Sequence, residues 1–345
     1  MKIVGCDLHT RYQQIAMLDA ETGEIEERRL EHESGEARGF YAGLAGPVRV
    51  GIEATGHTRW FERMLGELGH ELWIGDAAQI RASVVRKQKT DARDAAHLMD
   101  LLLSDRFPRI WRPSLEERDL RQLVWHRQKL VWMRNAVGNQ LHALAMGEGV
   151  CRKKKLFTKK GRVELEGLKL GRWASHRRQE LLTMMDQLDA SMKELDQAVA
   201  EQAEQNQSAM LLMTHPGVGP VTSLAFVLTL GPVERFERSK QVVSYLGLNP
   251  REHSSGGRQR LGAISKQGNP MMRSLLVEAG HTAARLDSEL RQDYQRLKLR
   301  RGSGVAKVAI ARKLAVRMYW MLRSPASYAQ LVRMQGSPRG TLVGQ

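Results

Sequence analysis

The sequence predicts a mixed α/β layer over residues 1–110, followed by a mainly helical remainder with a heptad-patterned stalk. Strand-like and helix-like segments alternate through the first 110 residues. A helical apolar pattern then runs over Leu115–Met146, and a heptad pattern follows at 181–199. We therefore divide the chain into an α/β domain (1–110), a helical region (111–205), a C-terminal domain (206–334) and a disordered tail (335–345).

The first 110 residues contain five strand-like segments. Lys2–Asp7 and Gln14–Asp19 are expected to pair through a tight hairpin, with a third strand near 26–30. Val48–Glu53 and Glu71–Ile74 are two further strands. Two helices are expected as well, one through Trp60, Met64, Leu65 and Leu68, and one over Ala92–Leu103.

The middle region is expected to form long helices around a basic loop. Arg152–Lys160 carries six basic residues in nine, which predicts a solvated loop that could follow a nucleic-acid backbone. The heptad seam predicts either a coiled coil between protomers or two helices of one chain packed as a hairpin. Trp125, Trp132 and Trp173 are expected to be packing residues rather than platforms on which bases stack. The basic residues expected to contact nucleic acid here are Arg152, Lys153, Lys154 and Lys155.

The C-terminal region is expected to be helical around turns and one polar loop. Helices are predicted at 221–230, 270–285 and 305–322, the last two with basic faces. The segment Pro216–Gly219 is either an ordinary turn or the turn of a helix-hairpin-helix, whose backbone amides, at Gly217 and Gly219, would grip a phosphate.

Composition favours a polyanionic partner. The chain has a net charge of +16, and residues 251–345 alone have 18 Lys and Arg against 5 Asp and Glu. This favours nucleic acid, although an anionic membrane surface would satisfy the same arithmetic. No apolar stretch is long enough to span a membrane, and an acid at position 7 comes too early for a secretory signal, so we expect a cytoplasmic protein. Cys6 and Cys151 suggest neither a disulfide framework nor a zinc site.

Four acidic residues could form a metal site. Asp7 and Glu53 each end a strand, and Asp91 and Asp94 lie three apart at a helix start, where both can face one direction. Clustered carboxylates repel each other unless cations neutralise them, and hard oxygen donors suit Mg²⁺ or Mn²⁺. Such a site can act on a phosphodiester. Each acid alone could instead be a cap or a surface charge, and Asp91 could be a helix N-cap.

A loop rich in hydrogen-bond donors covers 252–269. A serine beside glycines can approach a phosphate, and basic neighbours could stabilise the charge that develops on transfer. Alternatively, Ser254 and Ser255 only donate hydrogen bonds in a phosphate-binding loop. The residues expected to contact nucleic acid in and after this loop are Arg258, Arg260, Lys266, Asn269 and Arg273.

Taken in order, these motifs resemble the DEDD insertion-sequence transposases of the IS110 family, which are bridge-RNA-guided recombinases. The resemblance runs through nearly the whole chain. It is carried by Asp7, Glu53, Asp91-x-x-Asp94, Pro216-Gly217-Val218-Gly219, Tyr245-Leu246-Gly247-Leu248-Asn249-Pro250, Ser254-Ser255-Gly256 and Ile264-Ser265-Lys266-Gln267-Gly268-Asn269.

The resemblance implies a RuvC-like, RNase H-like first domain whose metal-binding tetrad is Asp7, Glu53, Asp91 and Asp94. It implies that Ser255 is the nucleophile that forms a phosphoserine with DNA, with the adjacent Ser254 as the alternative. It also implies target and donor DNA as substrates, a structured noncoding RNA as guide, and a dimer or tetramer in which one subunit's serine completes another's acidic site. Such a protein would act at the bacterial nucleoid.

Two other functions fit the same residues. A metal-only, junction-resolving nuclease would need the tetrad but not the serine. A noncatalytic RNA- or DNA-binding protein would need only the basic C-terminal region.

Overall fold

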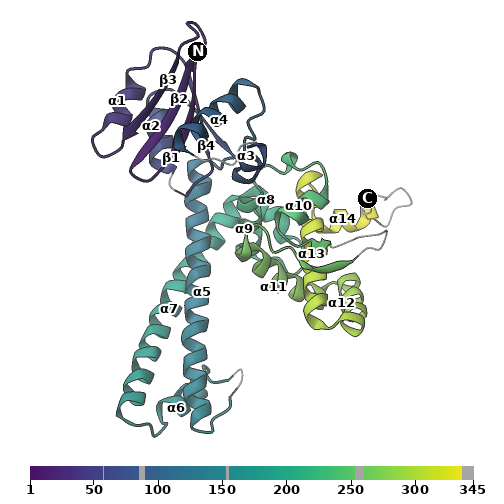
Figure 1. Cartoon of the computed structure of the whole chain (residues 1–345). Helices are drawn as coiled ribbons and strands as arrows, with labels where there is room; N and C mark the ends of the chain where they lie inside the picture. The colour runs from purple at the N-terminus through teal and green to yellow at the C-terminus, as the bar shows by residue number, and fades with distance from the viewer. Residues whose placement is uncertain (57, 85–89, 153–154, 253–259, 336–345) are drawn as a thin grey trace. The chain divides into compact units, whose positions relative to one another are not determined.

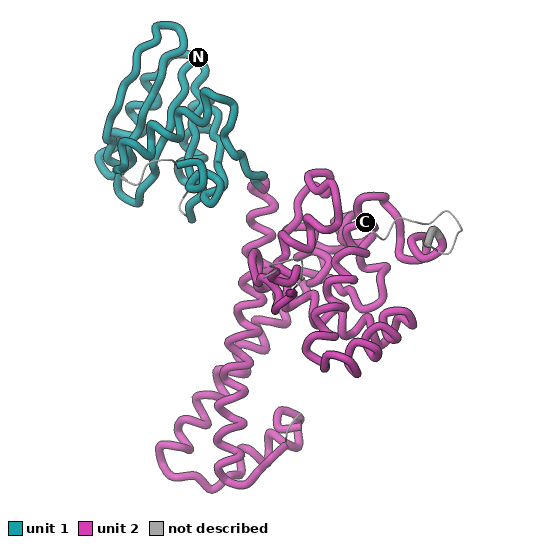
Figure 2. The backbone as a smooth tube through the Cα atoms, turned by 45° about the vertical axis from the view of Figure 1, so that its right-hand side comes forward, with its two compact units in different colours: residues 1–112 teal, residues 113–345 magenta. Residues whose placement is uncertain are grey.

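The computed structural model describes residues 1–56, 58–84, 90–152, 155–252 and 260–335. The chain forms two compact units, Met1–Arg112 and Pro113–Gln345, which are coloured separately in Figure 2. Across these described ranges, every helix is too short or too polar to cross a membrane. The predicted disordered tail lies almost entirely outside the described residues.

The first unit is built on a mixed five-stranded sheet with the order β3-β2-β1-β4-β5 (Figure 1). Strands β1, β2 and β3 pair antiparallel, whereas β1, β4 and β5 pair parallel. All five strands expected from the sequence are confirmed. Their bounds are Lys2–Leu8 (β1), Tyr12–Asp19 (β2), Ile25–Glu31 (β3), Val48–Glu53 (β4) and Glu71–Gly75 (β5).

Helices cover both faces of this sheet. On one face, Tyr41 of α1 and Phe61 and Leu65 of α2 pack in a core with Val4 and Ile52. On the other face, α4 packs in a separate core. Helices α1 and α3 were not expected from the sequence, because each is only seven residues long. The four helices are Glu36–Ala42 (α1), Arg59–Glu67 (α2), Ala77–Ser83 (α3) and Asp91–Leu103 (α4).

Two long helices, α5 (Leu115–Gly147) and α7 (Arg172–Gln205), pack side by side in the second unit (Figure 1). Leu141 of α5 and Leu182 and Met185 of α7 are buried in their shared core. Ion pairs between Arg134 and Asp189 and between Arg127 and Asp196 also join the two helices. The heptad seam is therefore used within one chain, as a helical hairpin.

The predicted solvated loop at 152–160 is partly wrong. Leu156 is fully buried, and Phe157 contacts His142 at a ring distance of 5.0 Å, so the segment is anchored to the hairpin. Helix α6 (Lys159–Glu166) already begins within it. The periodicity of this segment was hidden because two apolar residues are too few to show a pattern.

The three tryptophans that were expected to be packing residues are exposed. Trp125, Trp132 and Trp173 expose 47%, 44% and 72% of their surface. On both long helices the core face is occupied by aliphatic residues and methionine, and these tryptophans lie off it.

The rest of the second unit is mainly helical around one core. The helices predicted at 221–230, 270–285 and 305–322 are confirmed as α9, α11 and α13. The loop expected at 252–269 is wrong in part, because β7 (Leu261–Ile264) lies within it and pairs with β6 (Pro250–Glu252). Helices α12 and α14 were not expected. The remaining bounds are Gln207–Met213 (α8), Pro220–Leu230 (α9), Val233–Arg235 (η1), Ser239–Tyr245 (α10), Pro250–Glu252 (β6), Pro270–Leu286 (α11), Ser288–Arg301 (α12), Ser303–Arg323 (α13) and Tyr328–Gln335 (α14).

Candidate functional site

Two of the predicted acids lie at the ends of neighbouring parallel strands. Asp7 is near the end of β1, and Glu53 is the last residue of β4. Cys6 pairs with Ile52 in the register of these strands, so Asp7 and Glu53 are the next positions along. Side chains alternate between the faces of a sheet, and equivalent positions on paired strands share a face. Asp7 and Glu53 therefore start from the same face at the same edge of the sheet.

Helix α4 is brought down onto that face by a glycine. Gly5 precedes Asp7 by two residues and so lies on the same face. A Cβ atom at Gly5 would lie only 2.1 Å from the backbone oxygen of Ala95 and 2.4 Å from the backbone nitrogen of Met99. The helix can approach the strand this closely because position 5 has no side chain. Asp91 and Asp94 are in the first turn of this helix, one turn before the contact.

Asp91, at the start of α4, is linked to Asp7 through a histidine. The His9 Nε2 atom lies 3.1 Å from Asp7 Oδ2 and 3.4 Å from Asp91 Oδ2. The Tyr12 hydroxyl donates a hydrogen bond of 2.9 Å to Asp91 Oδ2, and its ring stacks on His9 at 4.7 Å. Arg29 covers the Tyr12 ring at 3.7 Å. The side chains of this cluster are thus oriented by one another.

Asp91 is not the N-cap of α4. Thr90 is the N-cap, and its side chain accepts a hydrogen bond from the Arg93 backbone N–H. Asp91 follows as the first helical residue, with its carboxylate turned to His9 and Tyr12.

Burial and neighbouring carboxylates both make the ionised form of Asp7 less favourable. Burial raises the pKa of Asp7; His9 opposes the rise, and the charges of Asp94 and Asp91 add to it. Asp94 is therefore close enough for its charge to act on Asp7. Glu53 has a different neighbour, Arg81 at 4.0 Å, and exposes about a third of its side chain.

The described residues fit a divalent cation. One ligand atom each from Asp7, His9 and Asp91 lies within 4.8 Å of the others. The two carboxylates are hard oxygen donors that suit Mg²⁺ or Mn²⁺, whereas the His9 imidazole, a donor that softer ions prefer, orients the carboxylates. A cation would also offset the repulsion from Asp94 and Asp91, which adds to the effect of burial on the pKa of Asp7.

His9 and Tyr12 were not predicted as members of this site. A signal for His9 was present, because it follows Asp7 by two residues at the end of a strand. Tyr12 had no such signal, since its contact with Asp91 spans 79 residues and depends on how α4 crosses the sheet.

The serine candidates Ser254 and Ser255, together with Arg258, lie outside the described residues, and so do Lys153 and Lys154. Strand β6 ends at Glu252, and Arg260 is exposed directly before β7. The hairpin strands therefore flank 253–259 in the chain.

The residues that follow β7 are held by specific contacts. Lys266 has a positive φ of 58°, and its backbone N–H bonds the oxygen of Gly247. Asn269 caps α11 through its side chain, which accepts from Met271 and Met272. Arg273 donates to the backbone oxygens of Leu246 and Gln267. Both Asn269 and Arg273 thus position the loop before α11.

The other predicted nucleic-acid contacts are dispersed. A Cβ at Gly217, which has φ +90°, would lie 2.5 Å from the Ala283 backbone nitrogen, so this glycine serves close packing on α11. Gly219 is exposed at the start of α9. Arg152 pairs with Glu164 at 2.9 Å, and Lys155 is exposed near it.

Comparison with known proteins gives matches in both units. A family model described as "Transposase", of the DEDD type, matches residues 4–147. A second, described as "Transposase IS116/IS110/IS902 family", matches residues 209–295.

Curated relatives are similar over most of their length. A "Probable family 20 transposase" of Pseudomonas aeruginosa is 28% identical over 335 residues, which is 93% of this chain and 96% of the relative. The transposase for insertion sequence element IS1111A of Coxiella burnetii is 26% identical over 341 residues, 95% of this chain and 91% of its own. The transposase for insertion sequence element IS1328 of Yersinia enterocolitica is 26% identical over 291 residues, 80% of this chain and 84% of its own.

Proposed function

The chain belongs to the IS110/IS116/IS902 family of transposases, and we propose that it exchanges DNA strands through a phosphoserine at Ser255, assisted by a divalent cation at Asp7, Glu53, Asp91 and Asp94. The observation that supports this most directly is the convergence of Asp7 with the first turn of α4. The five-stranded order with three antiparallel and then two parallel strands is consistent with a RuvC-like, RNase H-like domain.

The acidic residues would hold Mg²⁺ or Mn²⁺ between β1 and α4. Asp7 and Asp91 would supply carboxylate oxygens, and Asp94 and Glu53 flank them. A bound divalent cation would stabilise the negative charge that develops on the phosphate and the leaving oxygen. His9 and Tyr12 would hold the Asp91 carboxylate in a fixed orientation.

Ser255 would carry out the covalent step. Its Oγ attacks a phosphorus atom of the DNA backbone, a serine O–P bond forms, and the bond from phosphorus to one sugar oxygen breaks. The hydroxyl proton of the serine ends on the released sugar hydroxyl. A sugar hydroxyl of another strand then attacks the same phosphorus and releases the serine, so no external energy source is required. Arg258, Arg260 and Lys266 follow the serine in the chain and would stabilise the phosphate charge.

A structured noncoding RNA would select both target and donor DNA by base pairing. The support is the strongly basic C-terminal region, which can bind a phosphate backbone without reading bases. We also propose a dimer or tetramer. Because the acids belong to one compact unit and the serine to the other, one subunit's serine can serve another subunit's acidic site.

The test is covalent capture of a labelled DNA carrying the element's end, with its adjacent noncoding RNA and Mg²⁺. Wild-type protein should give a DNA adduct that survives denaturation, and Ser255→Ala should give none while still binding nucleic acid. Ser254→Ala is the matched control and should keep the adduct. If Ser255→Ala still cleaves and only Asp7→Asn is inactive, the protein is a metal-only nuclease. If element exchange in cells persists in both variants, the catalytic proposal is wrong altogether.

A further inference from the structure

Helix α5 carries a stripe in which cations and tryptophans alternate. Arg121, Trp125, Lys129 and Trp132 are spaced by four, four and three residues, so they lie on one face of the helix. Trp125 and Trp132 expose 47% and 44% of their surface. Exposed tryptophans at this spacing are not explained by core packing, because the aliphatic residues of α5 occupy its core face.

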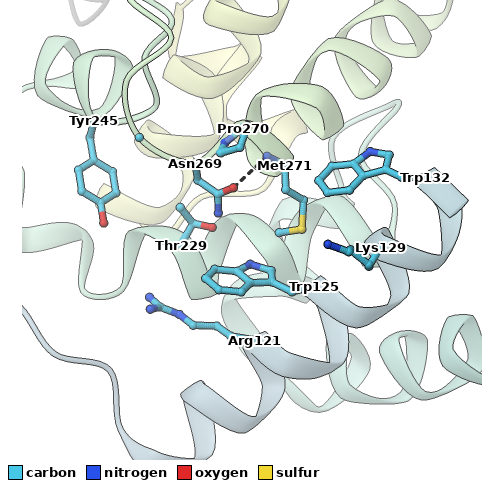
Figure 3. Close-up of a pocket in the computed structure, with 10 residues that line it drawn as sticks. Arg121, Trp125, Lys129, Trp132, Thr229, Tyr245, Asn269, Pro270 and Met271 are labelled. Atoms are coloured by element: carbon cyan, nitrogen blue, oxygen red, sulfur yellow. Dashed lines mark hydrogen bonds between the residues drawn. The ribbon is translucent and has the colours of Figure 1, made fainter. Parts of the chain in front are cut away.

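The stripe forms one wall of a pocket of about 530 Å³. The opposite wall comes from the ends of α9 and α10 and the start of α11, and all of it belongs to the second unit. In Figure 3 the side chains of Trp125, Lys129 and Trp132 reach from α5 towards Met271. This volume lies within the roughly 300–1,000 Å³ typical of ligand sites. The residues of the opposite wall are Thr229, Tyr245, Gly268, Asn269, Pro270 and Met271.

Both walls are held in place before any ligand binds. The Arg121 guanidinium donates to the backbone oxygen of Leu228, which fixes α5 against the end of α9. Asn269 accepts from the Met271 backbone N–H at 2.9 Å. Gly268 has φ +71° and packs so closely on Tyr245 that a Cβ would lie 2.1 Å from its backbone oxygen. A preformed pocket loses little conformational freedom on binding.

The chemistry of the lining indicates its ligand. Two indole rings and one phenol offer flat faces for stacking, and Arg121 and Lys129 lie between and beside the tryptophans. None of the ten lining residues is acidic. Aromatic faces alternating with cations are the arrangement that binds single strands, because bases stack on the rings while phosphates meet the cations.

We infer that this pocket binds an unstacked base of a single-stranded nucleic acid, stacked against Trp125 and Trp132, with its phosphate at Lys129. This goes beyond the proposed strand exchange, since it assigns a second nucleic-acid site, on α5. The strand can come from unpaired DNA or from RNA, whose bases share the required chemistry.

The test is equilibrium binding of a fluorescently labelled single-stranded oligonucleotide to the full chain. Binding is measured in EDTA from the fluorescence anisotropy of the oligonucleotide. Because the assay reads binding alone, the result does not depend on the proposed catalysis. Matching DNA and RNA oligonucleotides are used in parallel. The variants are Trp125→Leu with Trp132→Leu, Lys129→Gln alone, and Trp173→Leu as the control. Trp173 is also exposed and lies 5.0 Å from an arginine, but it does not line the pocket.

The double tryptophan variant should bind roughly 5- to 100-fold more weakly at every salt concentration, with an unchanged salt slope. Lys129→Gln should instead reduce the slope of log affinity against log salt by about 0.7, as expected for one lost phosphate contact on a single strand. Trp173→Leu should bind like wild type. A loss with only one of the two oligonucleotides supports the inference and identifies that strand as the ligand.

Unchanged binding of both oligonucleotides by the double variant would overturn the inference, as would an equal loss in Trp173→Leu. Replacing half-exposed tryptophans should leave the fold intact, which far-ultraviolet circular dichroism and an unchanged Tm would verify. A further readout needs no variant: an oligonucleotide with 5-iodouracil should crosslink to the peptide that contains Trp125 or Trp132. A crosslink confined to other peptides contradicts the assignment. If the double variant changes only the oligomeric state, the pocket is a contact between copies.

Discussion

Gly5 decides whether α4 can deliver its acids to Asp7, so Gly5→Ala should damage both stability and metal binding. The added Cβ would lie 2.1 Å from the Ala95 backbone oxygen, where ordinary contacts begin at 3.4 Å. Because the obstacle is backbone, the whole helix must move away from β1. Overpacking of this kind costs about 1–3 kcal/mol. In a domain of about 100 residues, each kcal/mol lowers Tm by roughly 4–8 °C.

The functional effect should exceed the loss of stability. Moving α4 separates Asp91 and Asp94 from Asp7, and disturbing the groups that orient metal ligands weakens binding about 10- to 100-fold. The assay is titration of the full chain with Mn²⁺ by calorimetry, with Tm measured on the same samples. Asp7→Asn should abolish the cation-dependent rise in Tm.

Gly51→Ala is the matched control. It lies on the neighbouring strand, but its added Cβ would meet Leu102 and Phe107 side-chain atoms at 2.7 and 2.9 Å, and side chains can move. We therefore expect a smaller loss of stability and near-normal Mn²⁺ affinity. Wild-type Mn²⁺ affinity in Gly5→Ala, or equal damage in both variants, would refute the role assigned to Gly5.

Two further predictions concern the second unit. Burial lowers the pKa of His215 to about 4 from an ordinary 6.5, so the folded state binds fewer protons than the unfolded state between these values. The contribution of neutral His215 to the free energy of unfolding should therefore be fully present above pH 6.5 and fall by up to about 3 kcal/mol as the pH drops towards 4. Denaturant melts should show that the free energy of unfolding of His215→Gln depends less on pH. The same pH dependence in both proteins would contradict this assignment. Leu182→Ala should remove about 2–5 kcal/mol from the α5–α7 hairpin because Leu182 is fully buried, with Met184→Ala, half exposed on the same helix, as the control. Hydrogen exchange should accelerate in α7 only in the first variant, and equal rates in both would count against the intrachain hairpin core.

The acidic residues of the candidate site could be predicted from the sequence, but most of the contacts between them could not. Asp7 and Glu53 lie near or at the ends of strands whose apolar content marks them locally, and Asp91 and Asp94 follow the helical spacing. The contact of Asp91 with Tyr12 was not predictable, because it depends on the path of α4 across the sheet. His9 was within reach of sequence reasoning and was missed.

The sequence by itself determined the five strands of the first unit and the apolar faces of most long helices, but not β6, β7 or α12. This is possible because the spacing of apolar residues within a segment matches the repeat of a strand or of a helix. The tertiary structure alone decided what covers each face: the 181–199 seam packs on α5 of the same chain, and Trp125 and Trp132 lie outside the core. An apolar stripe is equally satisfied by a helix of its own chain or of another, so only the arrangement of the whole chain distinguishes the two.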